Sequence, residues 1–160
     1  MNRYEALKHA VKAHAGQVDK CGQPYILHPI AVAEALERRT HRESEIVVAL
    51  LHDVWEDTDY LIPTADWEGE QDQWDALVAI TRRVNEPYFQ YINRVEGNYF
   101  AAHVKLADLW HNLSLQRQGC LPAAEVKSLE ARYLKARDRI WEALGYEWWP
   151  EPLSSDEGGR

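Results

Sequence analysis

The sequence predicts an all-α protein, a bundle of about six to eight helices. Apolar residues recur at intervals of three and four along most of the chain, and no stretch alternates between apolar and polar residues as a half-buried strand does. With 160 residues, 46% of them hydrophobic, and seven Trp, the chain can bury the core of one domain. We expect that domain to span residues 1–146 and a partly disordered tail to follow over residues 147–160.

The N-terminal part of the chain predicts two helices joined by a polar loop. An apolar stripe over residues 4–14 indicates the first helix, and residues 19–24 form the loop. Pro29 suits the first turn of a second helix that runs to Arg39. His28 is therefore expected just outside the N-terminus of that helix.

Five further helices are predicted in the rest of the chain. Their expected ranges are 43–58, 70–83, 87–95, 99–115 and 122–144. Residues 59–69 contain Pro63 and Gly69 and are expected to form a loop. In the helix over 70–83, the residues expected to face the core are Trp74, Leu77, Val78 and Ile80.

Composition excludes several classes of function. A formal net charge of −8 argues against binding to a nucleic acid polymer, which needs a positive surface. No window approaches the roughly 18 apolar residues of a membrane span, and the charged N-terminus does not resemble a signal peptide, so we expect a cytoplasmic protein. Cys21 and Cys120 are too few for a disulfide framework and lack CxxC spacing, so neither redox chemistry nor a zinc finger is expected. The expected partner is a small molecule, and the sequence leaves the choice between monomer and homo-oligomer open.

A cluster of ionisable residues follows the apolar run over 46–51. It contains His52, Asp53, Glu56 and Asp57, and burying such groups is costly unless they have partners. On a continuous helix His52 would lie above Glu56, and Asp53 above Asp57. His52 and Asp53 could then bind a divalent cation while the two later acids face a water on it. The alternative is a helix end whose acids simply face solvent.

A second candidate group lies in the helix predicted over 99–115. Lys105, Asp108 and Asn112 project from one side of it, although apolar residues surround Asp108. A lone buried carboxylate would be costly, so we interpret Asp108 as a metal ligand. The predicted metal ligands are His28, His52, Asp53 and Asp108. Two imidazoles and two carboxylates suit manganese, iron or zinc in a catalytic role and disfavour a structural zinc.

The order His, His-Asp, Asp on a helical chain resembles the HD-domain metal-dependent phosphohydrolases. The surrounding segments are similar to the hydrolase domain of the RelA/SpoT alarmone enzymes and to the small alarmone hydrolases. They are Ala13-His14-Ala15-Gly16-Gln17, Lys20, Gly22, Pro24-Tyr25-Ile26, His28-Pro29, Ala49 to Val54, Glu56-Asp57-Thr58, Val104 to Asp108 and His111-Asn112. The resemblance covers about residues 4–144 and implies an HD-domain helical bundle.

The resemblance implies an activity. Its substrate would be guanosine tetra- or pentaphosphate, from which a bound Mn²⁺ ion, with Fe²⁺ or Zn²⁺ as alternatives, helps to remove the 3′-pyrophosphate. The four predicted ligands would hold that ion. Glu56 and Asp57 match the acids that activate and orient the attacking water. Lys20 and Asn112 match substrate-binding residues of the family. To these we add Lys105, on the same helix side as Asp108, and Arg94, which lies in a polar, aromatic stretch that could cover a substrate but could equally be an exposed helix surface.

The chain departs from the family pattern at three positions that bear on the substrate. Asp19 stands where an Arg that stacks on guanine is typical, Leu109 replaces an Arg, and Leu115 replaces a Thr that contacts the nucleoside. The preferred base is therefore left open, and adenosine alarmones are candidates beside guanosine alarmones. Two different functions would also fit an HD-domain chain: a nucleoside 5′-monophosphatase and a non-catalytic nucleotide-binding module.

Overall fold

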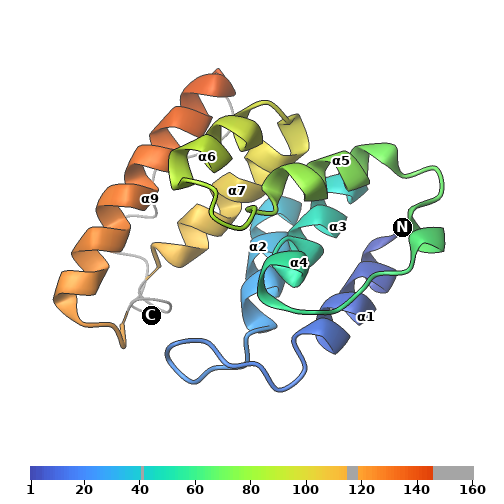
Figure 1. Ribbon diagram of the computed structural model, residues 1–160, viewed down its shortest axis with the longest axis horizontal. Coiled ribbons are helices and arrows are strands. Elements are labelled where there is room, and N and C mark those ends of the chain that lie inside the picture. Colours follow the sequence, from blue (N-terminus) through green and yellow to red (C-terminus); the bar gives the residue numbers. More distant parts are fainter. Residues whose placement is uncertain (41, 115–118, 146–160) are drawn as a thin grey trace.

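The computed structural model describes residues 1–40, 42–114 and 119–145. In these ranges it contains eight α-helices, one 3₁₀ helix and, as its only β feature, an isolated bridge between Val18 and Pro24. The helices are α1 (Arg3–Ala13), α2 (Leu27–Glu37), α3 (Glu43–Leu51), α4 (Val54–Asp57), η1 (Thr64–Trp67), α5 (Gln71–Ile80), α6 (Tyr88–Glu96), α7 (Tyr99–Asn112) and α9 (Ala123–Ala143). The all-α prediction is confirmed (Figure 1). The tail predicted over 147–160, and Leu115, lie outside the described residues.

Two helices, α3 and α7, form the centre of the bundle. α3 packs on α1, α2, α5 and α7, while α7 also packs on α2, α5, α6 and α9 (Figure 1). Every residue of α3 from Glu45 to Leu51 is buried, as are Leu106 and Leu109 of α7. A helix covered on most sides needs apolar residues almost throughout, which explains the composition of both. Glu45 of α3 and Asp108 of α7 are therefore held in the core, where each needs a partner.

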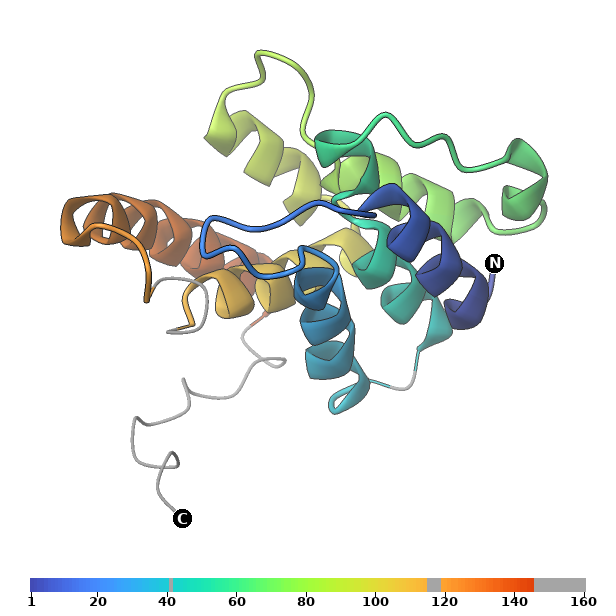
Figure 2. The ribbon, with the colours of Figure 1, turned by 90° about the horizontal axis from the view of Figure 1, so that it is seen from below.

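The loop between α1 and α2 lies at one end of the bundle. Figures 1 and 2 both show it reaching toward the connection that precedes α9. It leads into α2 through two turns, in which the backbone N–H groups of Leu27 and His28 donate to the carbonyls of Pro24 and Tyr25. His28 consequently lies inside the first turn of α2, not outside it as expected. Pro29 is tolerated beside it because N–H groups of the first turn lack intrahelical acceptors.

The prediction of one continuous helix over 43–58 is wrong. α3 ends at Leu51, residues 52 and 53 form a turn, and α4 covers only Val54–Asp57. On a continuous helix, consecutive side chains would point about 100° apart. Nε2 of His52 nevertheless lies 3.1 Å from Oδ2 of Asp53, so both side chains reach the same point. The predicted helix is thus interrupted, while His52 and Asp53 still point toward one site.

Two smaller expectations also differ from the structure. The loop predicted over 59–69 contains the short helix η1, whose Trp67 is buried against Trp55 and Trp74. Val78, expected to face the core, is 40% exposed.

No helix in the described ranges is both long and apolar enough to cross a membrane.

Candidate metal centre and active site

Three of the predicted ligands meet in the core, each from a different helix or turn. His28 lies in the first turn of α2, His52 in the turn after α3, and Asp108 on α7. Each offers one ligand atom, and these atoms lie within 4.8 Å of one another. Nε2 of His28 is 3.0 Å from Oδ1 of Asp108, and Nε2 of His52 is 3.7 Å from the same oxygen. All three side chains are buried, so the fold concentrates metal-ligating groups at this point.

Asp53, the fourth predicted ligand, lies beside this triad. Its Oδ2 is 3.1 Å from Nε2 of His52 and 3.4 Å from Nε2 of His28. The Tyr25 hydroxyl donates a hydrogen bond of 2.8 Å to the same oxygen. The Asp53 side chain is 17% exposed, whereas that of Asp108 is 3% exposed. Asp53 therefore lies on the side of the site nearer to solvent.

The hydrogen bonds of His52 support a metal at this position. Its Nδ1 lies 2.7 Å from the backbone carbonyl of Ala49, which can only accept, so Nδ1 carries a proton. Its Nε2 is buried and lies 3.1 Å from Oδ2 of Asp53, but it makes no well-aligned hydrogen bond among the described residues. A buried nitrogen of this kind between two carboxylates would be satisfied by a divalent cation. The mixed nitrogen and oxygen donors fit manganese, iron or zinc.

The charges of the site are strongly coupled. Burial opposes protonation of His52, but the carboxylates of Asp53 and Asp108 outweigh it and raise the pKa of the imidazole to about 10. Burial also disfavours ionisation of Asp108, yet Lys105 and the two imidazoles hold its pKa well below the usual range. Burial also opposes ionisation of Asp53, but the charge of His52 outweighs it and lowers the pKa of that carboxyl group, so both carboxylates are ionised at neutral pH. A divalent cation would take the place of the proton on His52.

Lys105 and Asn112, two predicted substrate-binding residues, both contact Asp108. Nζ of Lys105 lies 2.7 Å from Oδ2, and the amide of Asn112 donates to Oδ1. Burial opposes the charge on Lys105, but Asp108 outweighs it and raises the pKa of the ammonium well above its ordinary value. Both residues thus orient a metal-ligating carboxylate. Their contacts with a substrate stay a prediction.

Glu56 and Asp57 lie on α4, directly after the His52-Asp53 turn. Oε2 of Glu56 accepts a hydrogen bond of 3.1 Å from the backbone N–H of Arg82. Both side chains reach the surface, but the protein around them removes enough water to raise the pKa of each carboxyl group, and the charge of Asp53 adds to this effect. A carboxylate with a raised pKa is suited to take a proton near neutral pH.

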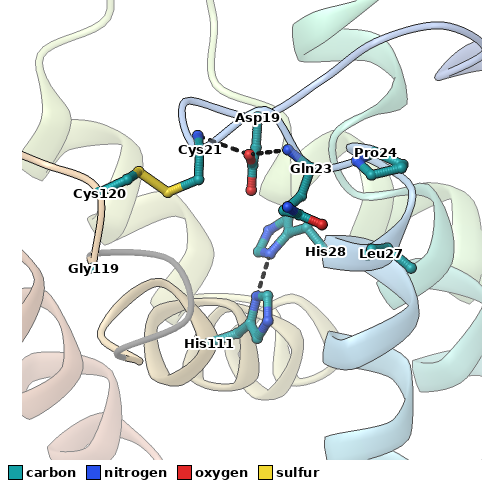
Figure 3. Close-up of a pocket in the computed structure, with 9 residues that line it drawn as sticks. All are labelled: Asp19, Cys21, Gln23, Pro24, Leu27, His28, His111, Gly119 and Cys120. Atoms are coloured by element: carbon teal, nitrogen blue, oxygen red, sulfur yellow. Dashed lines mark hydrogen bonds between the residues drawn. A yellow bond between two sulfur atoms is a disulfide. The ribbon is translucent and has the colours of Figure 1, made fainter.

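A pocket of about 420 Å³ opens beside His28 (Figure 3). Its volume lies within the range of roughly 300–1,000 Å³ typical of small-molecule sites. The residues that line it are Asp19, Cys21, Gln23, Pro24, Leu27, His28, His111, Gly119 and Cys120. The pocket therefore adjoins the metal-ligand cluster through His28.

One edge of this pocket is closed by a disulfide between Cys21 and Cys120, which join the loop after α1 to the connection before α9 (Figure 3). The sequence did not predict this bond, because two cysteines are too few for a disulfide framework. The partners are 99 residues apart, and sequence spacing carries no signal for such a pair. Oδ1 of Asp19 accepts from the backbone N–H groups of Cys21 and Gln23, at 2.8 and 2.9 Å. Asp19 thus organises the same loop.

Two cations predicted to bind substrate have protein partners in the structure. Lys20 is exposed and forms an ion pair with Glu125 at the start of α9.

Arg94 donates to the carbonyls of Val78, Ala79 and Thr81, at 2.7, 2.7 and 3.0 Å, and pairs with Glu86. Carbonyls at the C-terminus of a helix lack intrahelical donors. The guanidinium of Arg94 is therefore engaged in capping α5, and we do not include it in the proposed substrate site.

Comparison with known proteins agrees with this geometry. The HD domain family matches residues 6–94, which include His28, His52 and Asp53. The chain belongs to the HD-domain family. A solved structure of a metazoan ortholog of SpoT, described as hydrolyzing ppGpp and playing a role in starvation responses, is similar with a TM-score of 0.58 and 26% identity. The match covers 89% of this chain and 95% of that one, so the predicted resemblance of this HD-domain chain to ppGpp hydrolases is confirmed.

Curated relatives include both hydrolases and synthetases. A probable guanosine-3′,5′-bis(diphosphate) 3′-pyrophosphohydrolase of Synechocystis sp. is 32% identical over 162 residues, which cover 91% of this chain and 21% of that protein. A probable GTP pyrophosphokinase of Mycobacterium leprae is 31% identical over 121 residues, covering 70% of this chain and 15% of that protein. This HD-domain chain thus spans only about a fifth, or less, of the length of these relatives.

Proposed function

We propose that this HD-domain chain is a metal-dependent pyrophosphohydrolase that removes the 3′-pyrophosphate of an alarmone nucleotide, (p)ppGpp or a variant such as (p)ppApp. The observation that carries the proposal is the convergence of His28, His52 and Asp108, with Asp53 beside them, next to a pocket of about 420 Å³. The similarity to ppGpp hydrolases in sequence and fold supports the choice of substrate class.

His28, His52, Asp53 and Asp108 would hold the metal, which we propose to be Mn²⁺, with Fe²⁺ or Zn²⁺ as alternatives. When bound, the metal would lower the pKa of the water that it binds to a value near neutral pH. It would also offset negative charge on the attacked phosphoryl group. Glu56 or Asp57 accepts the proton of the attacking water, a role that their raised pKa values favour. Lys105 keeps Asp108 ionised and adds a buried positive charge to a site that receives an anionic substrate.

The nucleoside would occupy the pocket beside His28. Asp19 lies at its rim where related hydrolases typically carry an Arg, so stacking of a guanidinium on guanine is lost at this position. Lys20 supplies a cation in the same loop, although Glu125 now pairs with it. We therefore propose hydrolysis of an alarmone while leaving guanine and adenine as alternative bases.

The test is a nucleotide panel assayed with Mn²⁺, in which pyrophosphate and orthophosphate are measured separately. We expect pyrophosphate release from ppGpp, ppApp or both, and its loss in Asp53→Ala. Asp59→Ala is the matched control because Asp59 is an exposed acid just beyond α4. The proposal is contradicted if folded, Mn²⁺-loaded protein cleaves neither alarmone. Orthophosphate release from nucleoside 5′-monophosphates would instead favour a phosphatase of the same family.

A further inference from the structure

We propose that His111 is a positioning residue that holds His28 in the tautomer needed to bind the metal. This inference rests on the proposed metal site. Nδ1 of His111 lies 2.7 Å from Nδ1 of His28, and the planes of the two rings are inclined by only 28°, with centroids 4.9 Å apart. Both side chains are buried, at 2% exposed for His28 and 8% for His111. The two imidazoles therefore form a largely buried hydrogen bond in the wall of the pocket.

The position of His28 decides which nitrogen donates. Its Nε2 faces the oxygens of Asp108 and Asp53, so Nε2 is the atom that would bind a cation. A neutral imidazole that binds through Nε2 carries its proton on Nδ1. Because one proton must lie between the two Nδ1 atoms, His28 donates and His111 accepts. His111 is then the neutral tautomer with its own proton on Nε2.

His52 shows the same arrangement with a different acceptor. There Nδ1 is paired with the backbone carbonyl of Ala49, three residues earlier. At His28 the carbonyl in the equivalent place, that of Tyr25, accepts the backbone N–H of His28 itself at 2.9 Å. The side chain of His111 takes over the role of acceptor. The two imidazoles are thus oriented by two different hydrogen-bond acceptors: a backbone carbonyl for His52 and the side chain of His111, on α7, for His28.

His111 lies on the same helix as Asp108, the metal ligand that α7 contributes. His111 follows Asp108 by about one turn of the helix and directly precedes Asn112, whose amide donates to Asp108. One helix therefore contributes a ligand, the amide that orients it and the acceptor that orients a ligand on α2. A shift of α7 would disturb all three together.

The test compares His111→Asn with His111→Leu. Oδ1 of Asn can accept a hydrogen bond close to where Nδ1 of His does, whereas Leu offers no acceptor. We expect His111→Leu to weaken Mn²⁺ binding about 10- to 100-fold and His111→Asn to weaken it only a few-fold. Mn²⁺ affinity is measured by electron paramagnetic resonance and thermal unfolding is measured on chelated protein. Mn²⁺ affinity unchanged in folded His111→Leu would overturn the proposal.

His103→Asn is the control, because His103 is a buried histidine of the same helix whose Nδ1 pairs with Glu45. It should leave Mn²⁺ affinity unchanged even if it lowers the unfolding temperature. A second measurement needs no variant: long-range ¹H–¹⁵N spectra of the Zn²⁺-loaded wild-type protein should show the His28 proton on Nδ1. A proton on Nδ1 of His111 would contradict the proposal. Neither measurement involves hydrolysis, so failure of the alarmone assay and failure of this inference are distinguishable.

Discussion

The ammonium of Lys105 lies 2.7 Å from Oδ2 of Asp108, and the two residues share one face of α7 inside the bundle. A single buried carboxylate thereby serves both as a candidate metal ligand and as the partner of a buried cation. Removing either charge leaves the other without its partner, which is far more costly than losing a pair at the surface.

Replacement of this cation in Lys105→Met should destabilise the metal-free protein by about 3 kcal/mol, because Asp108 would remain buried without its closest positive charge. Mn²⁺ should restore much of the loss, since a cation at the ligand cluster supplies the missing charge. Urea unfolding with chelator and with Mn²⁺ measures both effects. Lys12→Met, which removes an exposed lysine of α1, should have little effect. Equal losses in the two variants would contradict the assignment.

Replacement of Arg94 separates its capping role from the substrate role predicted from sequence. Lys keeps the charge but cannot reach the carbonyls of Val78, Ala79 and Thr81 together. We expect Arg94→Lys to lower the free energy of unfolding by about 2 kcal/mol and to leave the KM of the nucleotide unchanged. A raised KM with unaltered stability would instead support direct binding of substrate by Arg94.

The disulfide between Cys21 and Cys120 should stabilise the fold without contributing to metal binding. It closes a loop of nearly 100 residues, for which chain entropy sets an upper limit of about 4.7 kcal/mol. Dithiothreitol, or Cys21→Ser combined with Cys120→Ser, should lower the unfolding temperature and weaken nucleotide binding because one edge of the pocket is released. Mn²⁺ affinity should not change, since the ligands lie on other elements. Dithiothreitol should have no effect on the double variant, and an effect there would mean that it acts elsewhere.

The pH dependence of hydrolysis should reflect Glu56 and Asp57. Because partial loss of water around the two carboxyl groups raises both pKa values, the acidic limb of kcat/KM should lie above the ordinary carboxylate value of about 4.3. A pH–rate profile over the range from pH 4 to pH 8 measures this limb. A limb at the ordinary value would contradict the role of this pair. Asp59→Asn should leave the whole profile unchanged.

The raised pKa of Glu56 also has a consequence for stability with a definite sign. A carboxyl group whose pKa is raised on folding favours the folded state below its ordinary pKa, and this contribution is lost as the pH rises through the raised value. Glu56→Gln removes the unfavourable charge, so it should be at least as stable as wild type at pH 7. Its hydrolytic rate should fall on the order of 100-fold. Loss of stability at pH 7 on urea unfolding would show that the charge is needed for folding.

The helices could be predicted because hydrophobic periodicity and capping residues act within one or two turns. The break at His52 and Asp53 could not, since the local sequence contains neither Gly nor Pro to end a helix there. In the structure both side chains converge on His28 and Asp108, which come from α2 and α7. The turn therefore coincides with contacts between helices, and the local sequence contains no signal for it.

The sequence by itself determined which residues have metal-ligating chemistry and that they belong to a helical bundle, because residue type and spacing carry that information. Only the tertiary structure decided what each polar group contacts. It directed Arg94 to the end of α5, joined Cys21 to Cys120, and placed His111 against His28 across 83 residues of chain. Such pairings depend on how helices pack in three dimensions, and no local pattern in the chain records those distances.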